Sequence, residues 1–555
     1  MIHLTRFNHH AISAGLCLSM GWPVLAFSET LPQLPVIPDI SCGTSSGKTT
    51  MVPSGGKLQA AIDAASPGDT ILLEAGATFV GPITLPKKTG TECITIRTSA
   101  TNSALPHASE RINPSYASVL PKIVSPGLNQ VALKTAYGAH HYKFIGVEFT
   151  KANEAASVSV LLELGDGIMD TLAQVPHHIE LDRVYAHGLP DSSLKHCVII
   201  NGSAMTVRNS YISECKIVGF DSQAILGFNG PGPIKIVNNY LEGAGENVMF
   251  GGADPRIPDL VPSDIEIRNN LFTKPLRWKI GDASYAGIPW QIKNLFELKN
   301  ARRVLVDGNI FEYSWVHAQV GYGIMITVRN QSNRAPWSVT EDLTFTNNII
   351  RHAANGFGLS GLDSNYQSQP TKRVLIKNNL FLDIGNPQWG GGGRLFQISN
   401  GPSNVTIEHN TGFQTGQILY AAGNIPSLNF IFRNNIAPHN AYGVFGDGAG
   451  VGLTTLNKYF PDFQFSTNVL ISNPFPKNYP SDNFNPAGVA AVGFTNVATG
   501  DYSLSPTSPY SKKGTDNTDI GINWLQLQAA LRVETGNISS HSDSHLAPPS
   551  LTIGP

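Results

Sequence analysis

The sequence predicts an all-β protein: a single-stranded, right-handed parallel β-helix (a solenoid) with a capping helix at its N-terminal end. Three observations lead to this prediction. A short strand motif recurs along the chain, almost no helical periodicity lies between its copies, and turn-forming residues are abundant, with 54 Gly and 37 Pro among 555 residues. Each repeat is too short to bury its own apolar face, so neighbouring repeats must stack.

The repeated motif is an apolar residue, a polar pair usually rich in Asn, and a second apolar segment, as in IRNNLF from Ile267 and IKNNLF from Ile376. Successive copies lie 25 to 39 residues apart. Stacked Asn amides hydrogen-bond from coil to coil, and Asn tolerates the left-handed turn between strands, so we interpret the aligned column as scaffold. The column contains Ser210, Asn239, Asn270, Asn309, Asn348, Asn379, Asn410 and Asn435.

The ends of the solenoid carry their own signals. The helical spacing of Leu58, Ala61, Ile62 and Ala65 predicts an amphipathic capping helix, and the turn at residues 67–69 is followed by a strand pattern. Near the other end, the segment INWLQLQAAL predicts a terminal helix. Residues 535–555, rich in Ser, His and Pro, are predicted to be a disordered tail.

The first 28 residues have the pattern of an export signal. Arg6 precedes an apolar run from Ala11 to Phe27, and Ala26-Phe27-Ser28 offers a small-x-small cleavage site. We therefore expect residues 29–534 to form the β-helix domain of a secreted or periplasmic protein.

Four cysteines follow the predicted signal, and an oxidising compartment permits two disulfides. The simplest pairs are Cys42 with Cys93 and Cys197 with Cys215, with buried free thiols as the alternative. The formal net charge of -2 provides no broad basic field for nucleic acid. Beyond the N-terminus, no stretch approaches the roughly 20 apolar residues of a membrane span.

Two stretches carry a family resemblance. LQAAIDAASPGDTILLEAGATF from Leu58, with CITIRTS from Cys93, resembles the N-terminal cap of the pectin-lyase-like β-helix superfamily. The resemblance implies the same right-handed solenoid for most of the chain.

Charged residues are concentrated in FELKNARRVLVDGNIF, residues 296–311. The strand alternation predicts that Phe296 and Leu298 point inward, while Glu297 and Lys299 point outward on one face. Aligning this strand with GIMITVRNQ in the next coil places Arg329 beside Lys299. At about 4.8 Å, two cations repel by about 3 kcal/mol at an effective dielectric of about 20, enough to lower the pKa of the lysine by about two units.

A lysine of lowered pKa beside an arginine suits β-elimination of a uronate polysaccharide. That reaction must neutralise the carboxylate, remove the proton next to it and protonate the leaving oxygen. We predict Lys299 as the base and Arg329 as the group that pairs with the carboxylate or acts near the leaving oxygen. Glu297 either orients Lys299, contributes to substrate binding, or holds a calcium ion.

A Glu and a Lys on one coil with an Arg on the next resemble the chondroitinase B and alginate lyase family, which has this fold. The resemblance implies that Lys299 is the base, that Arg329 assists, and that carboxylates with an Asn bind calcium. It points to Glu246, Asn247 and Glu297 as the metal ligands. The sequence departs from the family in having a single acidic residue close before the lysine.

Aromatic residues suggest a glycan cleft near these coils. Tryptophan rings stack on sugars, and five of the seven tryptophans fall in or beside the two coils, although covering the apolar wall under long loops explains them as well. We predict Trp315 and Trp337 as substrate-binding residues, with Arg394 and Gln397 extending the cleft. Arg302 is a further candidate, with a solvated turn residue as the alternative. The five tryptophans are Trp278, Trp290, Trp315, Trp337 and Trp389.

Two other functions are compatible with the sequence. A glycoside hydrolase on the same fold would draw its carboxylate pair from Glu246, Asp254 and Glu297. A non-catalytic glycan-binding or surface β-helix protein is the other alternative. The clustering of charged residues and tryptophans on adjacent coils favours the lyase.

Overall fold

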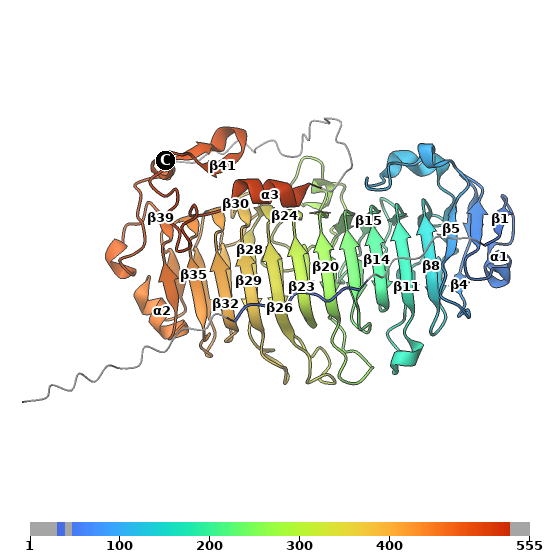
Figure 1. Ribbon diagram of the computed structural model, residues 1–555, viewed down its shortest axis with the longest axis horizontal. Helices are drawn as coiled ribbons and strands as arrows, with labels where there is room; N and C mark the ends of the chain where they lie inside the picture. Colours follow the sequence, from blue (N-terminus) through green and yellow to red (C-terminus); the bar gives the residue numbers. More distant parts are fainter. Residues whose placement is uncertain (1–29, 39–46, 533–555) are drawn as a thin grey trace, which may run out of the picture.

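The computed structural model describes residues 30–38 and 47–532 (Figure 1). The predicted export signal, the predicted C-terminal tail from residue 535, and Cys42 lie outside the described residues. Among the described residues, no helix has both the length and the apolar composition that crossing a membrane requires.

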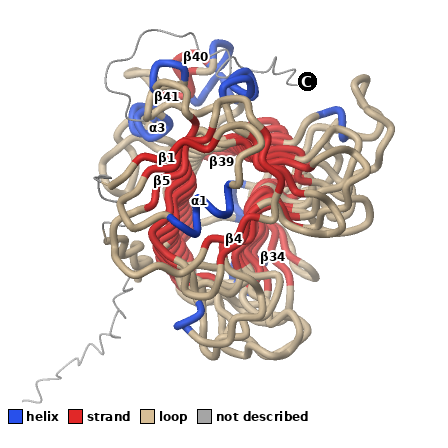
Figure 2. The backbone as a smooth tube through the Cα atoms, turned by 90° about the vertical axis from the view of Figure 1, so that its right-hand side faces the viewer, coloured by secondary structure: helices blue, strands red, loops and turns tan. Residues whose placement is uncertain are grey.

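The chain forms a right-handed parallel β-helix, as the sequence predicts (Figures 1 and 2). Each complete coil contributes one strand to each of three parallel sheets, which we call sheets A, B and C, and the coils at the two ends are incomplete. In the described part of the chain, these sheets contain 14, 13 and 12 strands, respectively. A two-stranded antiparallel ribbon, β40 with β41, lies outside the solenoid.

The strands are short, and each sheet takes one from every complete coil. Sheet A contains β1 (Thr49–Val52), β2 (Thr70–Leu73), β5 (Ile94–Thr98), β8 (His140–Ile145), β11 (His177–Asp182), β14 (Ser203–Arg208), β17 (Ile234–Val237), β20 (Ser263–Arg268), β23 (Ala301–Asp307), β26 (Thr340–Thr346), β29 (Lys372–Lys377), β32 (Ser403–Glu408), β35 (Phe430–Arg433) and β38 (Gln464–Ser466). Sheet B contains β3 (Thr78–Val80), β6 (Lys122–Ser125), β9 (Glu148–Lys151), β12 (Tyr185–His187), β15 (Tyr211–Cys215), β18 (Tyr240–Gly243), β21 (Leu271–Thr273), β24 (Ile310–Ser314), β27 (Ile349–Ala353), β30 (Leu380–Ile384), β33 (Thr411–Gln414), β36 (Ile436–Pro438) and β39 (Val469–Ile471). Sheet C contains β4 (Ile83–Leu85), β7 (Leu133–Thr135), β10 (Val160–Leu164), β13 (His196–Ile200), β16 (Gln223–Gly227), β19 (Glu246–Phe250), β22 (Phe296–Leu298), β25 (Tyr322–Thr327), β28 (Asn355–Ser360), β31 (Phe396–Ser399), β34 (Leu419–Ala422) and β37 (Val444–Gly446). The ribbon strands are β40 (Phe494–Asn496) and β41 (Asp501–Leu504).

The apolar residues that alternate along the strands point into the solenoid and form one core from Val52 to Tyr479. Phenylalanine rings stack along it; those of Phe272 and Phe311, on neighbouring coils of sheet B, have centroids 4.3 Å apart. Because every coil buries its inward face in this core, a site has to be formed by outward-facing side chains that helices and loops leave uncovered.

The predicted asparagine column is confirmed as a ladder between sheets A and B. Asn309 donates from its backbone N and its Nδ2 to Oδ1 of Asn348, at 2.9 and 3.0 Å, and the same pair of bonds repeats at the other asparagine rungs. The ladder also continues through Asn468 to Asn483, which the sequence analysis missed. From Ser210 to Asn468, the residue before each ladder position is the left-handed one, such as Asn347 with φ 55°, so the turn and the amide ladder use different residues.

Helices cover the ends and one side of the solenoid. Helix α1 (Leu58–Ala64) is the predicted cap and lies over the N-terminal end of the core (Figure 2). Helix α2 (Leu453–Tyr459), which the sequence analysis did not anticipate, buries Leu456 at the C-terminal end. The predicted terminal helix exists as α3 (Trp524–Leu531) but does not plug that end, because its buried face packs on outward apolar residues of sheet B (Figure 1).

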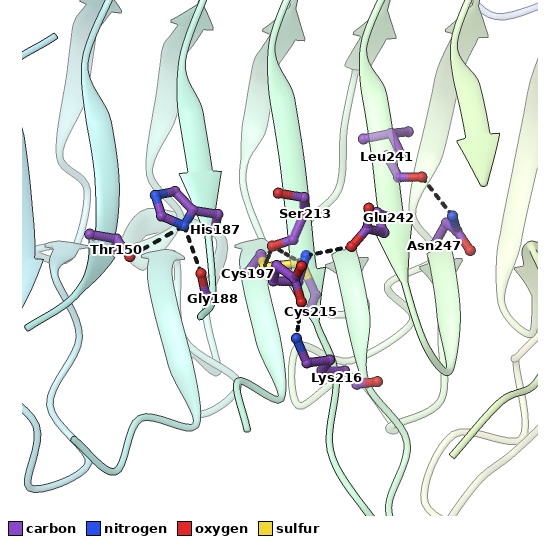
Figure 3. Close-up of a disulfide and its surroundings, with 12 residues drawn as sticks. Thr150, His187, Gly188, Cys197, Ser213, Cys215, Lys216, Leu241, Glu242 and Asn247 are labelled. Carbon is purple, nitrogen blue, oxygen red and sulfur yellow. Dashed lines mark hydrogen bonds and ion pairs between the residues drawn. A yellow bond between two sulfur atoms is a disulfide. The ribbon is translucent and has the colours of Figure 1, made fainter. Parts of the chain in front are cut away.

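One predicted disulfide is present. Cys197 at β13 is bonded to Cys215 at the end of β15, and both residues are fully buried (Figure 3). This bond cross-links sheets C and B within one coil. The other predicted pair includes Cys42, outside the described residues.

Candidate functional site

A cavity of about 500 Å³ opens where three consecutive strands of sheet C, β22, β25 and β28, end. Its wall is mostly polar and is formed by outward side chains of these strands and by the loops that follow them. The residues used below are Glu297, Lys299, Met325, Thr327, Arg329, Asp363, Asn365 and Tyr366.

The two residues predicted to be catalytic meet at this cavity. The register of β22 and β25 pairs Leu298 with Ile326. The alignment predicted from the sequence paired Leu298 with Val328 and was therefore wrong by two residues. Side chains alternate with a period of two along a strand, so this error preserved the inward and outward assignments. Arg329 donates its backbone N–H to the carbonyl of Lys299 at 2.8 Å.

Lys299 forms an ion pair with Glu297, two residues earlier on the same face of the strand. Its Nζ lies 3.6 Å from Oε1 of Glu297, and the two side chains are 12% and 4% exposed. Burial raises the pKa of Glu297 to about 7; Lys299 and Lys293 oppose this effect, and the nearby Glu246 carboxyl adds to it. The carboxyl is thus a group that can take up a proton at neutral pH beside the lysine.

Arg329 is held by a carboxylate of its own. Its Nη1 donates to Asp363 at 2.6 Å and to Ser364 at 3.1 Å, and Asp363 also accepts the backbone N–H of Asn330 at 2.8 Å. Burial alone would raise the pKa of Asp363, but the hydrogen bonds from Asn365, Asn330 and Arg329 leave it lowered. The repulsion between Lys299 and Arg329 that the sequence predicts is therefore offset, because each of the two cations has a carboxylate partner.

A second charged group adjoins Glu297 near the beginning of these strands. Glu246, fully buried, accepts a hydrogen bond from Gln223 at 2.5 Å and lies 3.1 Å from Nζ of Lys293. Lys293 also contacts Asp221 at 2.7 Å. Burial lowers the pKa of Lys293, but the Glu246 and Asp221 carboxylates outweigh it and leave the pKa raised.

Two buried amide oxygens of this group have no hydrogen-bond donor among the described residues, Oε1 of Gln223 and Oδ1 of Asn294, and Oε1 of Glu246 has only its ion pair with Lys293. Asn294 joins the group by donating its Nδ2 to Glu297 at 3.2 Å. A buried oxygen without a donor costs free energy, so an external cation or water is the partner that such a cluster lacks.

The predicted metal ligand Asn247 lies elsewhere, which corrects that prediction. Its side chain points away from the cavity and donates to the carbonyls of Leu241 and Thr273 at 2.7 and 2.8 Å, while its Oδ1 accepts from the buried Lys274 (Figure 3 shows the bond to Leu241). The side chain of Asn247 is fully buried, and its hydrogen bonds go to residues of β18 and β21 and to Lys274, which follows β21.

No family model and no curated protein matches the chain. Among solved structures, it is similar to a mannuronic acid specific polysaccharide family 6 lyase from human gut microbiota, with 11% identity, 80% of this chain and 93% of that chain covered, and a TM-score of 0.48. It is also similar to the PL6 family alginate lyase AlyGC, with 15% identity, coverage of 86% and 58%, and a TM-score of 0.42. PfbA, a surface adhesin of Streptococcus pneumoniae, has 11% identity, coverage of 70% and 87%, and a TM-score of 0.41.

Arg394 and Gln397 lie on the same outward face as Glu297, further along the solenoid. The register places Gln397 of β31 beside Gly358, which is itself beside Met325. Gln397 accepts hydrogen bonds from Arg394 and from Tyr322, both at 2.7 Å. The guanidinium of Arg394 also lies 3.6 Å from the ring centroid of Tyr420, so the face beyond the cavity is polar and aromatic.

Most of the tryptophans have a structural role, which corrects the prediction of a tryptophan-lined cleft. Trp315 is 4% exposed and packs with three other tryptophans under the loops that join sheet B to sheet C. Trp337 is half-buried and donates its indole N–H to the carbonyl of Leu260 at 3.0 Å. Neither residue lines the cavity. The cluster contains Trp278, Trp290, Trp315 and Trp389.

Two other predicted residues also lie away from the cavity. Arg302 belongs to β23 in sheet A, where its Nε donates to Ser263 at 3.0 Å. Asp254 accepts the backbone N–H groups of Ser332 and Arg334, at 2.8 and 3.1 Å, and thereby holds a loop. Arg302 is therefore a strand residue, which corrects both its predicted role in substrate binding and the alternative of a solvated turn residue, and Asp254 has a loop-holding role.

The sequence analysis missed four residues of the site: Gln223, Lys293, Asn294 and Asp363. Lys293 and Asn294 lie just before Glu297, and the segment KNLFELK carries the signal of a polar cluster at a strand start. Gln223 and Asp363 belong to other coils, and only the register of the strands brings them to the site.

Proposed function

We propose that this protein is a polysaccharide lyase that cleaves an acidic, uronate-containing glycan by β-elimination. The observation that carries the proposal is the pairing of Lys299 with Glu297, and of Arg329 with Asp363, around one polar cavity. A buried carboxyl of raised pKa beside the lysine can exchange a proton, whereas an arginine stays charged. A base and a fixed cation are the two groups that the reaction requires.

In this reaction the uronate carboxylate binds Arg329. Among the described residues the hydrogen bonds of its side chain come from Nη1, which leaves Nη2 and Nε for the substrate. Nζ of Lys299 removes the proton from the carbon next to the carboxylate. A double bond forms between this carbon and its neighbour, the neighbour's bond to the glycosidic oxygen breaks, and Lys299 returns the proton to the leaving oxygen.

Calcium is the cofactor that we propose for this site. Glu246, Glu297, Asn294 and Gln223 offer carboxylate and amide oxygens, the ligands that calcium prefers, and the buried amide oxygens of Gln223 and Asn294 have no hydrogen-bond donor among the described residues. A bound calcium ion would neutralise negative charge near the substrate carboxylate. Each of the two carboxyls also has a lysine partner, Lys293 for Glu246 and Lys299 for Glu297, so a bound ion would add to these ion pairs.

We also propose that the protein acts outside the cytoplasm. The Cys197–Cys215 disulfide supports this location, since such bonds persist in oxidising compartments.

The test uses purified protein and a panel of uronate polysaccharides, followed by the ultraviolet absorbance of the unsaturated product. We expect a rise with at least one glycan, its loss in Lys299→Ala, and its retention in Lys235→Ala, a matched strand lysine on sheet A. If new reducing ends formed without an increase in ultraviolet absorbance, the reaction would be hydrolysis. If neither reducing ends nor absorbance increased with any acidic or neutral glycan, a non-catalytic binding protein would be favoured.

A further inference from the structure

Four histidines lie together near the N-terminal end of the solenoid. His140 and His141 begin strand β8, and His177 and His178 begin β11 on the next coil. The register pairs His140 directly with His177, so the two doublets lie side by side in sheet A. This arrangement is separate from the cavity, which begins with β22, four coils beyond the coil of β11.

The backbone explains why both side chains of each doublet meet. Neighbouring residues of a regular strand point to opposite faces. His141 and His178 instead have left-handed φ values of 59° and 52°, which interrupt this alternation. As a result, the Nδ1 atoms of His140 and His141 lie 2.7 Å apart, and those of His177 and His178 lie 2.8 Å apart.

The rings also stack between coils, which makes a two-by-two array of imidazoles. The centroids of His140 and His177 are 4.6 Å apart, and those of His141 and His178 are 4.5 Å apart, with 9° between the ring planes in both pairs. One ligand nitrogen from each of His140, His141 and His177 lies within 4.8 Å of the others. Zn–N bonds of about 2.0–2.1 Å place tetrahedral ligands about 3.3 Å apart, so small ring rotations suffice to converge on one ion.

The surroundings keep the array in the form that binds metals. Burial, followed by repulsion among the rings, lowers the pKa of His141 and of His177 to about 4, and burial also lowers the pKa of His140 and His178. Uncharged imidazole is the form that binds a metal. Within each doublet the two Nδ1 atoms share a hydrogen bond, so a metal ion would replace that bond, and the shared proton would move to an Nε2 atom or to solvent.

Two charged side chains face the array and act in opposite directions. The carboxylate of Glu92, exposed on the preceding coil, raises the pKa of His141, which places negative charge near the rings. The ammonium of Lys87, also exposed, lowers the pKa of His140 and His177. Glu92 should attract a cation to the array, and Lys87 should repel it.

We propose that the cluster of His140, His141, His177 and His178 binds one divalent transition-metal ion through imidazole nitrogens. Zn²⁺ is the probe of choice, because imidazole nitrogens are common ligands of this ion. Zn²⁺ also has no geometric preference from its d electrons, so it can adapt to the arrangement of the four rings. The ion links two coils whose first histidines are 37 residues apart (His140 to His177) and so stabilises the N-terminal third of the solenoid.

The experiment titrates Zn²⁺ into the full chain, prepared without an affinity tag, by isothermal calorimetry and by thermal unfolding. We expect one ion per chain and a higher Tm with Zn²⁺, and both effects should be lost in the double variant His141→Ala, His177→Ala. His107→Ala, at an exposed histidine outside the cluster, is the matched control. Retention of one-to-one binding in the double variant would overturn the proposal, because the ion would then bind elsewhere.

Two surface variants keep the test decisive if the double variant does not fold. Glu92→Gln should weaken Zn²⁺ binding several-fold, and Lys87→Met should strengthen it by a similar factor. Unchanged affinity in both variants would refute a site at the array. With Cu²⁺ as the probe, nitrogen hyperfine structure in the electron paramagnetic resonance spectrum should report imidazole ligands, and a spectrum with oxygen ligands alone would count against the proposal.

Discussion

Nζ of Lys299 lies 3.6 Å from Oε1 of Glu297, two residues earlier in the chain, and both side chains face the same cavity. A strand presents every second residue on one face, so a spacing of two is what allows this pair to form. The pair joins the proposed base to a buried carboxyl whose pKa is raised. The protonation of the Glu297 carboxyl therefore affects both the stability of the fold and the proposed chemistry of the site.

Glu297 should make the protein less stable as the pH rises. Because burial raises its pKa from 4.5 to about 7, the folded state binds this proton more tightly than the unfolded state does. The stabilisation is complete below the unfolded pKa of 4.5 and is lost as the pH rises through about 7. Between pH 4.5 and 8, the free energy of unfolding of the unmodified protein should fall by up to about 3 kcal/mol because of this group, and this fall should be absent in Glu297→Gln, as measured by denaturant unfolding.

The control for this measurement is Glu154→Gln, at an exposed glutamate away from the cavity. It should leave the pH dependence of unfolding unchanged. If Glu297→Gln and the unmodified protein lost stability equally between pH 4.5 and 8, the carboxyl of Glu297 would be charged throughout this range.

Asp363 should position Arg329 for the substrate. Removing its carboxylate in Asp363→Ala deletes the 2.6 Å bond to the guanidinium and releases the backbone N–H of Asn330. We expect kcat/KM for glycan cleavage to fall by about 10- to 100-fold, which corresponds to about 1.4–2.7 kcal/mol of transition-state stabilisation. The ultraviolet assay with the glycan that the protein cleaves measures this effect.

Ser364→Ala is the matched change, because Ser364 contacts the same nitrogen of Arg329 at 3.1 Å without a charge. Its kcat/KM should fall by less than about threefold. Wild-type activity in Asp363→Ala would show that the guanidinium needs no carboxylate to hold it.

Calcium should raise the Tm, and the effect should depend on Asn294. An ion that binds only the folded state stabilises it by about 2.7 kcal/mol at a concentration 100 times its Kd. Asn294→Ala and Glu246→Gln should reduce this stabilisation. Asn247→Ala should lower the Tm equally with and without calcium, since Asn247 bonds to interior carbonyls. A calcium effect lost only in Asn247→Ala would place the ion in the interior instead.

The sequence was sufficient to predict the fold because the ladder between sheets A and B requires the same residue type once per coil. Asn270 and Asn379 occupy equivalent positions although three coils separate them. The same logic located Lys299 and Arg329, since an alignment error of two residues leaves the faces of a strand unchanged.

The rest of the site could not be predicted because it depends on local backbone geometry and on register. Asn247 and Asn294 are both buried asparagines near the starts of sheet C strands, yet Asn247 bonds to carbonyls of sheet B strands whereas Asn294 bonds to Glu297. Asp363 reaches the site from the loop after β28, one coil beyond Arg329. Trp315 was misassigned because a sequence does not show which side of a loop an aromatic ring faces.

Asn348 should be among the most sensitive positions of the scaffold. Its Oδ1 accepts the backbone N–H and Nδ2 of Asn309 at 2.9 and 3.0 Å, and its Nδ2 donates to the carbonyl of Val306 at 3.0 Å. Asn348→Ala leaves these buried groups without partners, at about 1–3 kcal/mol each. We expect a loss of at least about 3 kcal/mol in urea unfolding, while Asn153→Ala, at an exposed asparagine, should cost less than about 0.5 kcal/mol.

The size of the Asn348 effect also tests how the coils are coupled. In a solenoid each coil contacts its neighbours, so a break in the ladder interrupts cooperativity at that coil. Asn348→Ala should therefore expose amide protons of β23 and β26, on either side of the break, to hydrogen exchange before those of β5 and β8. Uniform acceleration of exchange along the whole chain would show instead that the solenoid unfolds as one unit.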